Sequence, residues 1–155
     1  MERIENILAE MERAADDFSA AVKGISENVL SRRPDEKNWS AKEIICHVRD
    51  TEEYFLSRFQ MILSFDEPKF SPADAGRWAA ERQYLRNDVG EALTAFRQRR
   101  RETLAFVKEI KPDQWDRTCL HAVRGRMTLR DYLNLLAGHD KNQLDQINRA
   151  LAGRV

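Results

Sequence analysis

His139 and Gln143 are polar residues on a helix face that is otherwise apolar. Their neighbours on that face, spaced by three and four residues, are Leu129, Tyr132, Leu133, Leu136, Ile147 and Ala150. This spacing places all of these side chains on one side of a helix. A buried imidazole or amide costs desolvation free energy unless a partner satisfies it. A metal ion is one such partner, because neutral imidazole ligates zinc, nickel, iron or copper.

His47 also interrupts an apolar stripe, on an earlier helical segment. If both stripes face one interior, His47, His139 and Gln143 could hold a divalent metal and leave a position open for water or substrate, as catalytic sites do. Glutamine is a weak ligand compared with imidazole. The alternative is a set of hydrogen-bonded core residues, which is the commoner fate of a buried histidine.

Arg100 and Asp50 are the candidate catalytic residues outside this ligand set. Arg100 interrupts a third apolar stripe, where it could hold a substrate carboxylate, form an ion pair with a neighbouring helix, or extend its head to solvent. Asp50 follows His47 by three residues and could orient its imidazole, ligate the metal, pair with Arg100 or lie on the surface. His121, in a loop, could lean over the mouth of the site or simply be exposed.

The hydrophobic pattern predicts an all-α protein, a four-helix bundle formed by residues 1–155 as a single domain. The expected helices cover residues 4–25, 40–62, 85–111 and 129–152, with N-caps at Ser40 and Thr128. Proline and glycine interrupt residues 64–84, which predicts a long crossover between the second and third helices with a short helix at 74–82. Residues 118–127 could pair locally as strands.

Composition and charge exclude several classes of protein. There are 26 basic and 26 acidic residues, and this balance argues against nucleic-acid binding. No apolar run approaches the ~18 residues of a membrane span, and the first residues lack the apolar core of a secretory signal. Cys46 and Cys119 form no CxxC pair, so no disulfide is expected and a cytoplasmic location is predicted.

Three segments together resemble the DinB-like (DinB/YfiT) superfamily of metal-binding four-helix bundles. They are NWSAKEIICHVRDTEEYF from Asn38, FRQRRRETL from Phe96 and RGRMTLRDYLNLLAGHDKNQLDQI from Arg124. The resemblance implies a bundle with a long crossover and a divalent metal held by three histidines. Carried onto this sequence, the first two ligands are His47 and His139. The third position is Gln143, so a zinc or nickel ion would be bound weakly or not at all.

The resemblance implies two main functions. Known members include thiol S-transferases that use bacillithiol or mycothiol, and a mycothiol-dependent maleylpyruvate isomerase. The leading expectation is therefore a divalent-metal-dependent enzyme that acts on a small molecule, with thiol S-transfer as one reaction. The alternative is a non-catalytic bundle with a degenerate metal site that binds a small ligand or acts as a dimeric stress-associated protein. A homodimer could use the crossover aromatics Phe65, Phe70, Trp78 and Tyr84, or these side chains could pack onto the protein's own bundle.

Overall fold

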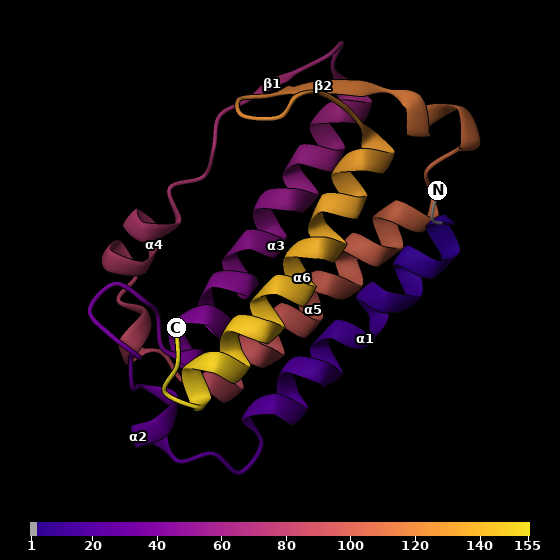
Figure 1. Ribbon diagram of the computed structural model, residues 1–155. Coiled ribbons are helices and arrows are strands. Elements are labelled where there is room, and N and C mark those ends of the chain that lie inside the picture. The colour runs from indigo at the N-terminus through magenta and orange to yellow at the C-terminus, as the bar shows by residue number, and fades with distance from the viewer. Residues whose placement is uncertain (1–2) are drawn as a thin grey trace.

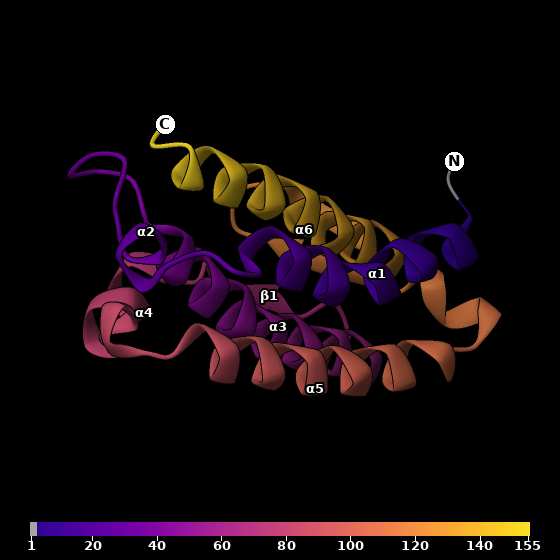
Figure 2. The same ribbon diagram turned by 90° about the horizontal axis from the view of Figure 1, so that it is seen from below.

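Four long helices form the bundle in the computed structural model, which describes residues 3–155. They are α1 (Ile4–Val22), α3 (Ala41–Ser64), α5 (Val89–Lys108) and α6 (Leu129–Leu151) (Figure 1). Both α1 and α3 pack against α5 and α6. The neighbours α3 and α5 run in the same direction, as do α1 and α6 (Figures 1 and 2). The parallel pair α3 and α5 needs a long crossover, so the predicted all-α bundle with this connection is confirmed.

The helices that carry the two histidines begin at the predicted caps. Ser40 Oγ accepts from the backbone N–H of Glu43, whose carboxylate accepts from Ser40 N–H. Thr128 and Asp131 form the same reciprocal capping box at the start of α6. Each box satisfies N–H groups that have no partner within the helix. The starting points of α3 and α6 are therefore fixed locally.

Three helix ends differ from the prediction by three residues or more, and one of them is the end of α5, at Lys108 instead of residue 111. The first long helix ends at Val22 because Gly24 adopts a φ of +74°, and a short helix α2 (Glu27–Leu30) follows. The third long helix begins at Val89, later than predicted, because the Asp88 side chain accepts from Glu91 N–H. The periodicity alone did not reveal these local hydrogen bonds.

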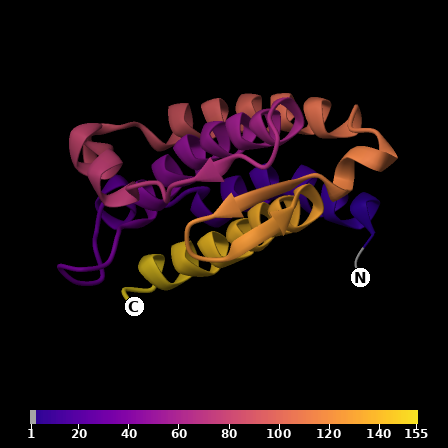
Figure 3. The same cartoon turned by 90° about the horizontal axis from the view of Figure 1, so that it is seen from above.

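The crossover contains the expected short helix and one unexpected strand. Its elements are β1 (Lys69–Phe70), α4 (Ala75–Glu81) and the 3-10 helix η1 (Tyr84–Arg86). After α5 come a second 3-10 helix η2 (Pro112–Asp116) and the hairpin of β2 (Thr118–His121) and β3 (Gly125–Thr128). The hairpin confirms the predicted local pairing, and β1 adds to it in parallel with β2. Figure 3 shows the hairpin alongside α6.

Two of the four crossover aromatics are buried on the protein's own bundle. Phe70 is 3% exposed and Tyr84 is 1% exposed, whereas Phe65 is 57% exposed. Phe70 and Tyr84 therefore have an intramolecular role, and the homodimer stays a prediction.

Both cysteines are free and buried. Among residues 3–155, every helix is too short or too polar to cross a membrane.

Candidate metal centre

The rings of His47 on α3 and His139 on α6 meet inside the bundle. Their Nε2 atoms lie 3.1 Å apart, and their ring centroids are separated by 5.1 Å with planes tilted by 63°. His47 is 9% exposed. Because α3 and α6 pack against each other along the bundle, residues 92 positions apart in the chain reach one point.

The geometry of this pair fits two chemical arrangements. Two nitrogens that ligate one zinc ion at ~2.0–2.1 Å in a tetrahedral site lie roughly 3.3 Å apart, close to the observed separation. The same distance fits an N–H···N hydrogen bond in which one ring donates and the other accepts. A metal site would include a third ligand atom near the two imidazoles, whereas a hydrogen-bonded pair would not require one.

Gln143 supplies a candidate for that third donor. It lies one helical turn after His139, and its Oε1 atom is buried without a hydrogen-bond partner within the described part of the chain. A buried acceptor left unpaired is unusual in a folded protein and calls for a ligand. Within residues 3–155, no three His, Cys, Asp or Glu side chains are grouped to hold a metal. The Gln143 amide oxygen is therefore the protein atom considered as a third ligand beside the two imidazoles.

Both imidazoles are neutral near pH 7. The pKa of each is lowered to about 4, chiefly by burial, and the nearby His139 ring contributes to the lowering for His47. The Nδ1 atom of His47 lies 3.3 Å from the Thr51 hydroxyl. If Nδ1 carries the proton and donates to Thr51, the lone pair of Nε2 is free for a ligand. The Trp39 and Phe55 rings cover the pair at centroid distances of 5.0 Å and 6.2 Å.

The stability of the metal-free protein should fall as the pH drops from 6.5 to 4. Between these pH values histidine is protonated in the unfolded chain but stays neutral in the folded protein. Protonation therefore favours unfolding. A pKa lowered from 6.5 to about 4 corresponds to about 3 kcal/mol for one histidine. Urea denaturation at pH 7 and pH 4.5 should show a shallower pH dependence in His139→Gln than in the natural sequence. An equal pH dependence in the two proteins would contradict this.

Arg100 is held in the core by three other helices. Its Nε and Nη2 atoms donate to Glu52 on α3 at 2.7 and 2.8 Å, and its Nη atoms donate to Asp140 on α6 at 2.8 and 2.9 Å. Nη1 also donates to the Met11 carbonyl on α1 at 2.9 Å. All five N–H groups are used and the residue is 2% exposed. Of the roles considered for Arg100, the structure shows the interhelical ion pair and leaves no donor free for a substrate carboxylate.

Asp50 belongs to a different polar cluster, although it follows His47 on the same helix. Its carboxylate accepts from the Tyr84 hydroxyl at 2.6 Å and from Arg49, Arg82 and Arg99 at 2.9 to 3.2 Å. Burial raises the pKa of Asp50, but these donors outweigh burial and the net shift is downward. Neither Asp50 nor Arg100 hydrogen-bonds to His47 or His139. The structure thus gives Asp50 the role of an anchor between α3 and the crossover.

His121 shapes the tip of the hairpin. Its Nδ1 atom accepts from the backbone N–H groups of Val123 and Arg124, each at 3.1 Å. Burial and the neighbouring Arg124 lower its pKa, which keeps Nδ1 available as an acceptor. This contact holds the turn between β2 and β3.

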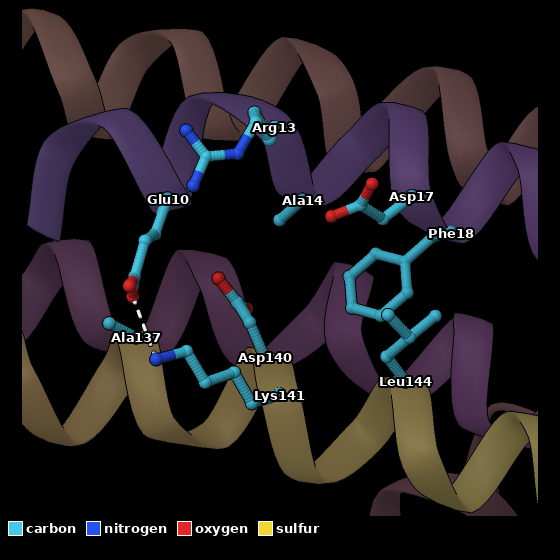
Figure 4. A pocket seen from close by; sticks show the side chains of 9 residues that line it. All are labelled: Glu10, Arg13, Ala14, Asp17, Phe18, Ala137, Asp140, Lys141 and Leu144. Carbon is cyan, nitrogen blue, oxygen red and sulfur yellow. Dashed lines mark ion pairs between the residues drawn. The ribbon is translucent and has the colours of Figure 1, made fainter. Parts of the chain in front are cut away.

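Residues of α6 line several hollows, and one of these includes a histidine of the pair. A groove of about 570 Å³ is lined by His139 and Met127, among other residues. A smaller pocket of about 140 Å³ lies between α1 and α6 (Figure 4). There Asp140 points into the gap between the helices, and Lys141 pairs with Glu10 at 3.0 Å. The larger groove therefore borders one ring of the histidine pair, that of His139.

Comparison with known proteins agrees with this arrangement. The sequence pattern of the DinB superfamily matches residues 10–147. The chain belongs to the DinB superfamily. The solved structure of YfiT from Bacillus subtilis has a TM-score of 0.87 at 18% identity and covers 94% of this chain and 84% of its own. That structure is described provisionally as a metal-dependent hydrolase with an unusual four-helix bundle topology. At this identity, the match shows the shared fold.

Two curated relatives come from Oceanobacillus iheyensis, and both are provisionally named metal-dependent hydrolases. One is 19% identical over 152 residues, which make up 98% of this chain and 87% of the relative. The other is 20% identical over 109 residues, 70% of this chain and 63% of the relative. These relatives, one matching 98% and the other 70% of this chain, carry metal-dependent names, which supports a divalent metal in general terms.

Proposed function

We propose that this protein is a metal-dependent enzyme of the DinB superfamily that acts on a small molecule. In this proposal a divalent ion, zinc or nickel, is held by His47 Nε2, His139 Nε2 and Gln143 Oε1. The carrying observation is the 3.1 Å approach of two neutral imidazole nitrogens, with a buried and unpartnered amide oxygen one turn away. Three protein ligands would leave a coordination position for water or substrate.

The residues around the proposed site suit this chemistry. A bound divalent ion lowers the pKa of a water or thiol ligand and so supplies a nucleophile near neutral pH. The Trp39 ring packs against His47 and the Phe55 ring against His139, and the Thr51 hydroxyl orients the His47 ring. The relatives' names favour hydrolysis, and thiol S-transfer is the second reaction that the same site would support.

Metal analysis of the purified protein tests this proposal. We expect the natural sequence to retain zinc or nickel and both His47→Ala and His139→Ala to lose it, because each removes one of two imidazole ligands. His121→Ala is the matched control, since His121 contacts the hairpin turn instead, and it should retain the metal. Elemental analysis after dialysis against a defined metal buffer gives the stoichiometry. Equal metal content in all four proteins would reject the site.

The second candidate function is a metal-free bundle that binds a small ligand. The observation that favours it is that 3.1 Å also suits a direct hydrogen bond between the two imidazoles. In that case His47 and His139 are a structural pair and Gln143 lacks a metal partner. A natural protein that retains no metal under these conditions would support this second candidate.

A further inference from the structure

A groove beside His139 has the volume of a small-molecule site and a mainly polar lining. Its volume of about 570 Å³ falls within the range of ~300–1,000 Å³ typical of ligand pockets. It lies between α6 and the β2–β3 hairpin, which run alongside each other (Figure 3). Its lining residues are Arg124, Met127, Asp131, Asn134, Leu135, Gly138, His139 and Asn142. The groove therefore leads to one ring of the histidine pair.

Gly138 is the least expected residue of this lining. It lies within α6 and is not among the glycines with positive φ. A Cβ atom built on it would have no neighbour within 4 Å. Glycine destabilises a helix interior relative to alanine, so neither the backbone conformation nor close packing explains this residue. What the missing side chain does provide is open space in the groove immediately before His139.

The polar side chains of the groove are free to contact a ligand. Asn134 and Asn142 lie one helical turn before and after Gly138, so the three share one line along α6. Both amides are exposed, and neither has a hydrogen-bond partner among residues 3–155. Arg124 is exposed at the hairpin turn that His121 holds, and its guanidinium is likewise unpaired in that part of the chain.

The one carboxylate in the lining is already engaged. Asp131 belongs to the capping box of α6, where its Oδ2 atom accepts from Thr128 N–H at 3.0 Å. Asp131 keeps its negative charge, but its hydrogen bond holds it at the start of the helix. The Arg124 guanidinium is the cation of the lining and has no ion pair within residues 3–155, so it can pair with an anionic group. The two amides can donate to or accept from an uncharged polar group.

We propose that this groove binds a small carboxylate that also carries an amide or similar polar group. Arg124 binds the carboxylate, Asn134 and Asn142 bind the polar group, and Gly138 gives the ligand room to reach His139. This inference rests on the proposed function, because it places the substrate beside the same histidine pair. It adds the chemical class of the substrate and a residue that determines its size.

Binding of two probes to the full chain tests this inference. N-acetylglycine carries a carboxylate, and N-acetylglycinamide replaces it with a neutral amide. Titrations followed by NMR, with and without zinc, should show tighter binding of the acid. Arg124→Gln should remove that preference. Gly138→Ala should lower the affinity for both probes roughly tenfold, because one added methyl group has an effect of this size in a complementary site.

Stability measurements show whether Gly138→Ala loses probe binding because the groove is blocked or because the fold is damaged. Gly138→Ala should unfold roughly 2–4 °C higher than the natural protein, because alanine favours the helix. Gly76→Ala is the matched control: Gly76 is an exposed glycine on α4, and this change should leave probe binding unaltered. Three results would each overturn the inference. They are undiminished probe binding to Gly138→Ala, a preference for the acid that persists in Arg124→Gln, and no binding of either probe to the natural protein.

Metal content distinguishes this inference from the proposed function. Gly138→Ala and Arg124→Gln leave His47, His139 and Gln143 in place, so both variants should bind zinc like the natural protein. The natural protein could bind no metal and still bind the probes with the expected dependence on Arg124 and Gly138. In that case the metal proposal is wrong and the inference about the groove is supported. If zinc binds and the variants do not change probe binding, the groove inference fails alone.

Discussion

Arg100→Met should destabilise the protein by about 3–5 kcal/mol at pH 7, the cost typical of removing one partner from a buried ion cluster. Methionine keeps much of the length of the side chain but leaves Glu52 and Asp140 without the guanidinium. Burial already raises the pKa of Asp140, and Arg100 opposes that shift. Without Arg100 the Asp140 carboxyl group should take up a proton on folding. The loss should therefore be smaller near pH 5 than at pH 7.

Urea denaturation of Arg100→Met and Arg97→Met measures this effect against a matched control. Arg97 lies on the same helix and pairs with Asp16 at 2.7 Å, but its side chain is 37% exposed. Pairs of this exposed kind contribute about 0–1 kcal/mol. Adding Glu52→Gln and Asp140→Asn to Arg100→Met should recover part of the loss. A loss no larger than that of Arg97→Met would show that the cluster contributes little.

The Arg100 cluster matters for the site because of the helices that it joins. Glu52 lies on α3 with His47, and Asp140 follows His139 directly on α6. The guanidinium bonds both carboxylates and also the α1 carbonyl of Met11. Through these five hydrogen bonds, the helices that carry the two imidazoles are tied to α5 and to each other.

The features that were predictable from sequence depend on local rules. A period of three to four residues placed four helices, and two capping boxes placed the starts of α3 and α6. A histidine within an apolar stripe must face the interior, so His47 and His139 could be identified as inward-facing before their contact was known. The same argument identified Arg100 as a break in an apolar stripe, but left open whether its guanidinium pairs inside the bundle or extends to solvent.

The features that escaped prediction depend on contacts distant in the chain. Nothing local indicates that Arg100 selects Glu52 and Asp140 over Asp50, which lies two residues before Glu52 and faces Tyr84 and three arginines instead. Likewise, β1 has only two residues, and its pairing depends on β2, about fifty residues later. Gly138 reads as a neutral helix position until the groove beside it is seen. Pairing of this kind is decided by packing, which periodicity does not encode.

Gln143→His should raise the affinity for zinc or nickel by at least about tenfold, or 1.4 kcal/mol, because imidazole is a stronger ligand than a neutral amide oxygen. The change also removes the buried amide oxygen that lacks a partner, so no large loss of stability is expected. Competition with a chromophoric chelator gives the affinity. Gln98→His adds an imidazole on the exposed side of α5 and should leave the affinity unchanged.

The affinity of the natural protein decides what the gain from Gln143→His means. If the natural protein binds metal and the variant binds it more tightly, the glutamine is a weak third ligand and the proposed enzyme site holds. If only the variant binds metal, the natural pair of imidazoles is joined by its own hydrogen bond, and the metal-free ligand-binding bundle is the better account. If the natural protein and Gln143→His bind metal with the same affinity, the side chain at position 143 does not reach the ion. In that case the orphaned oxygen of Gln143 requires a partner of another kind, such as a buried water.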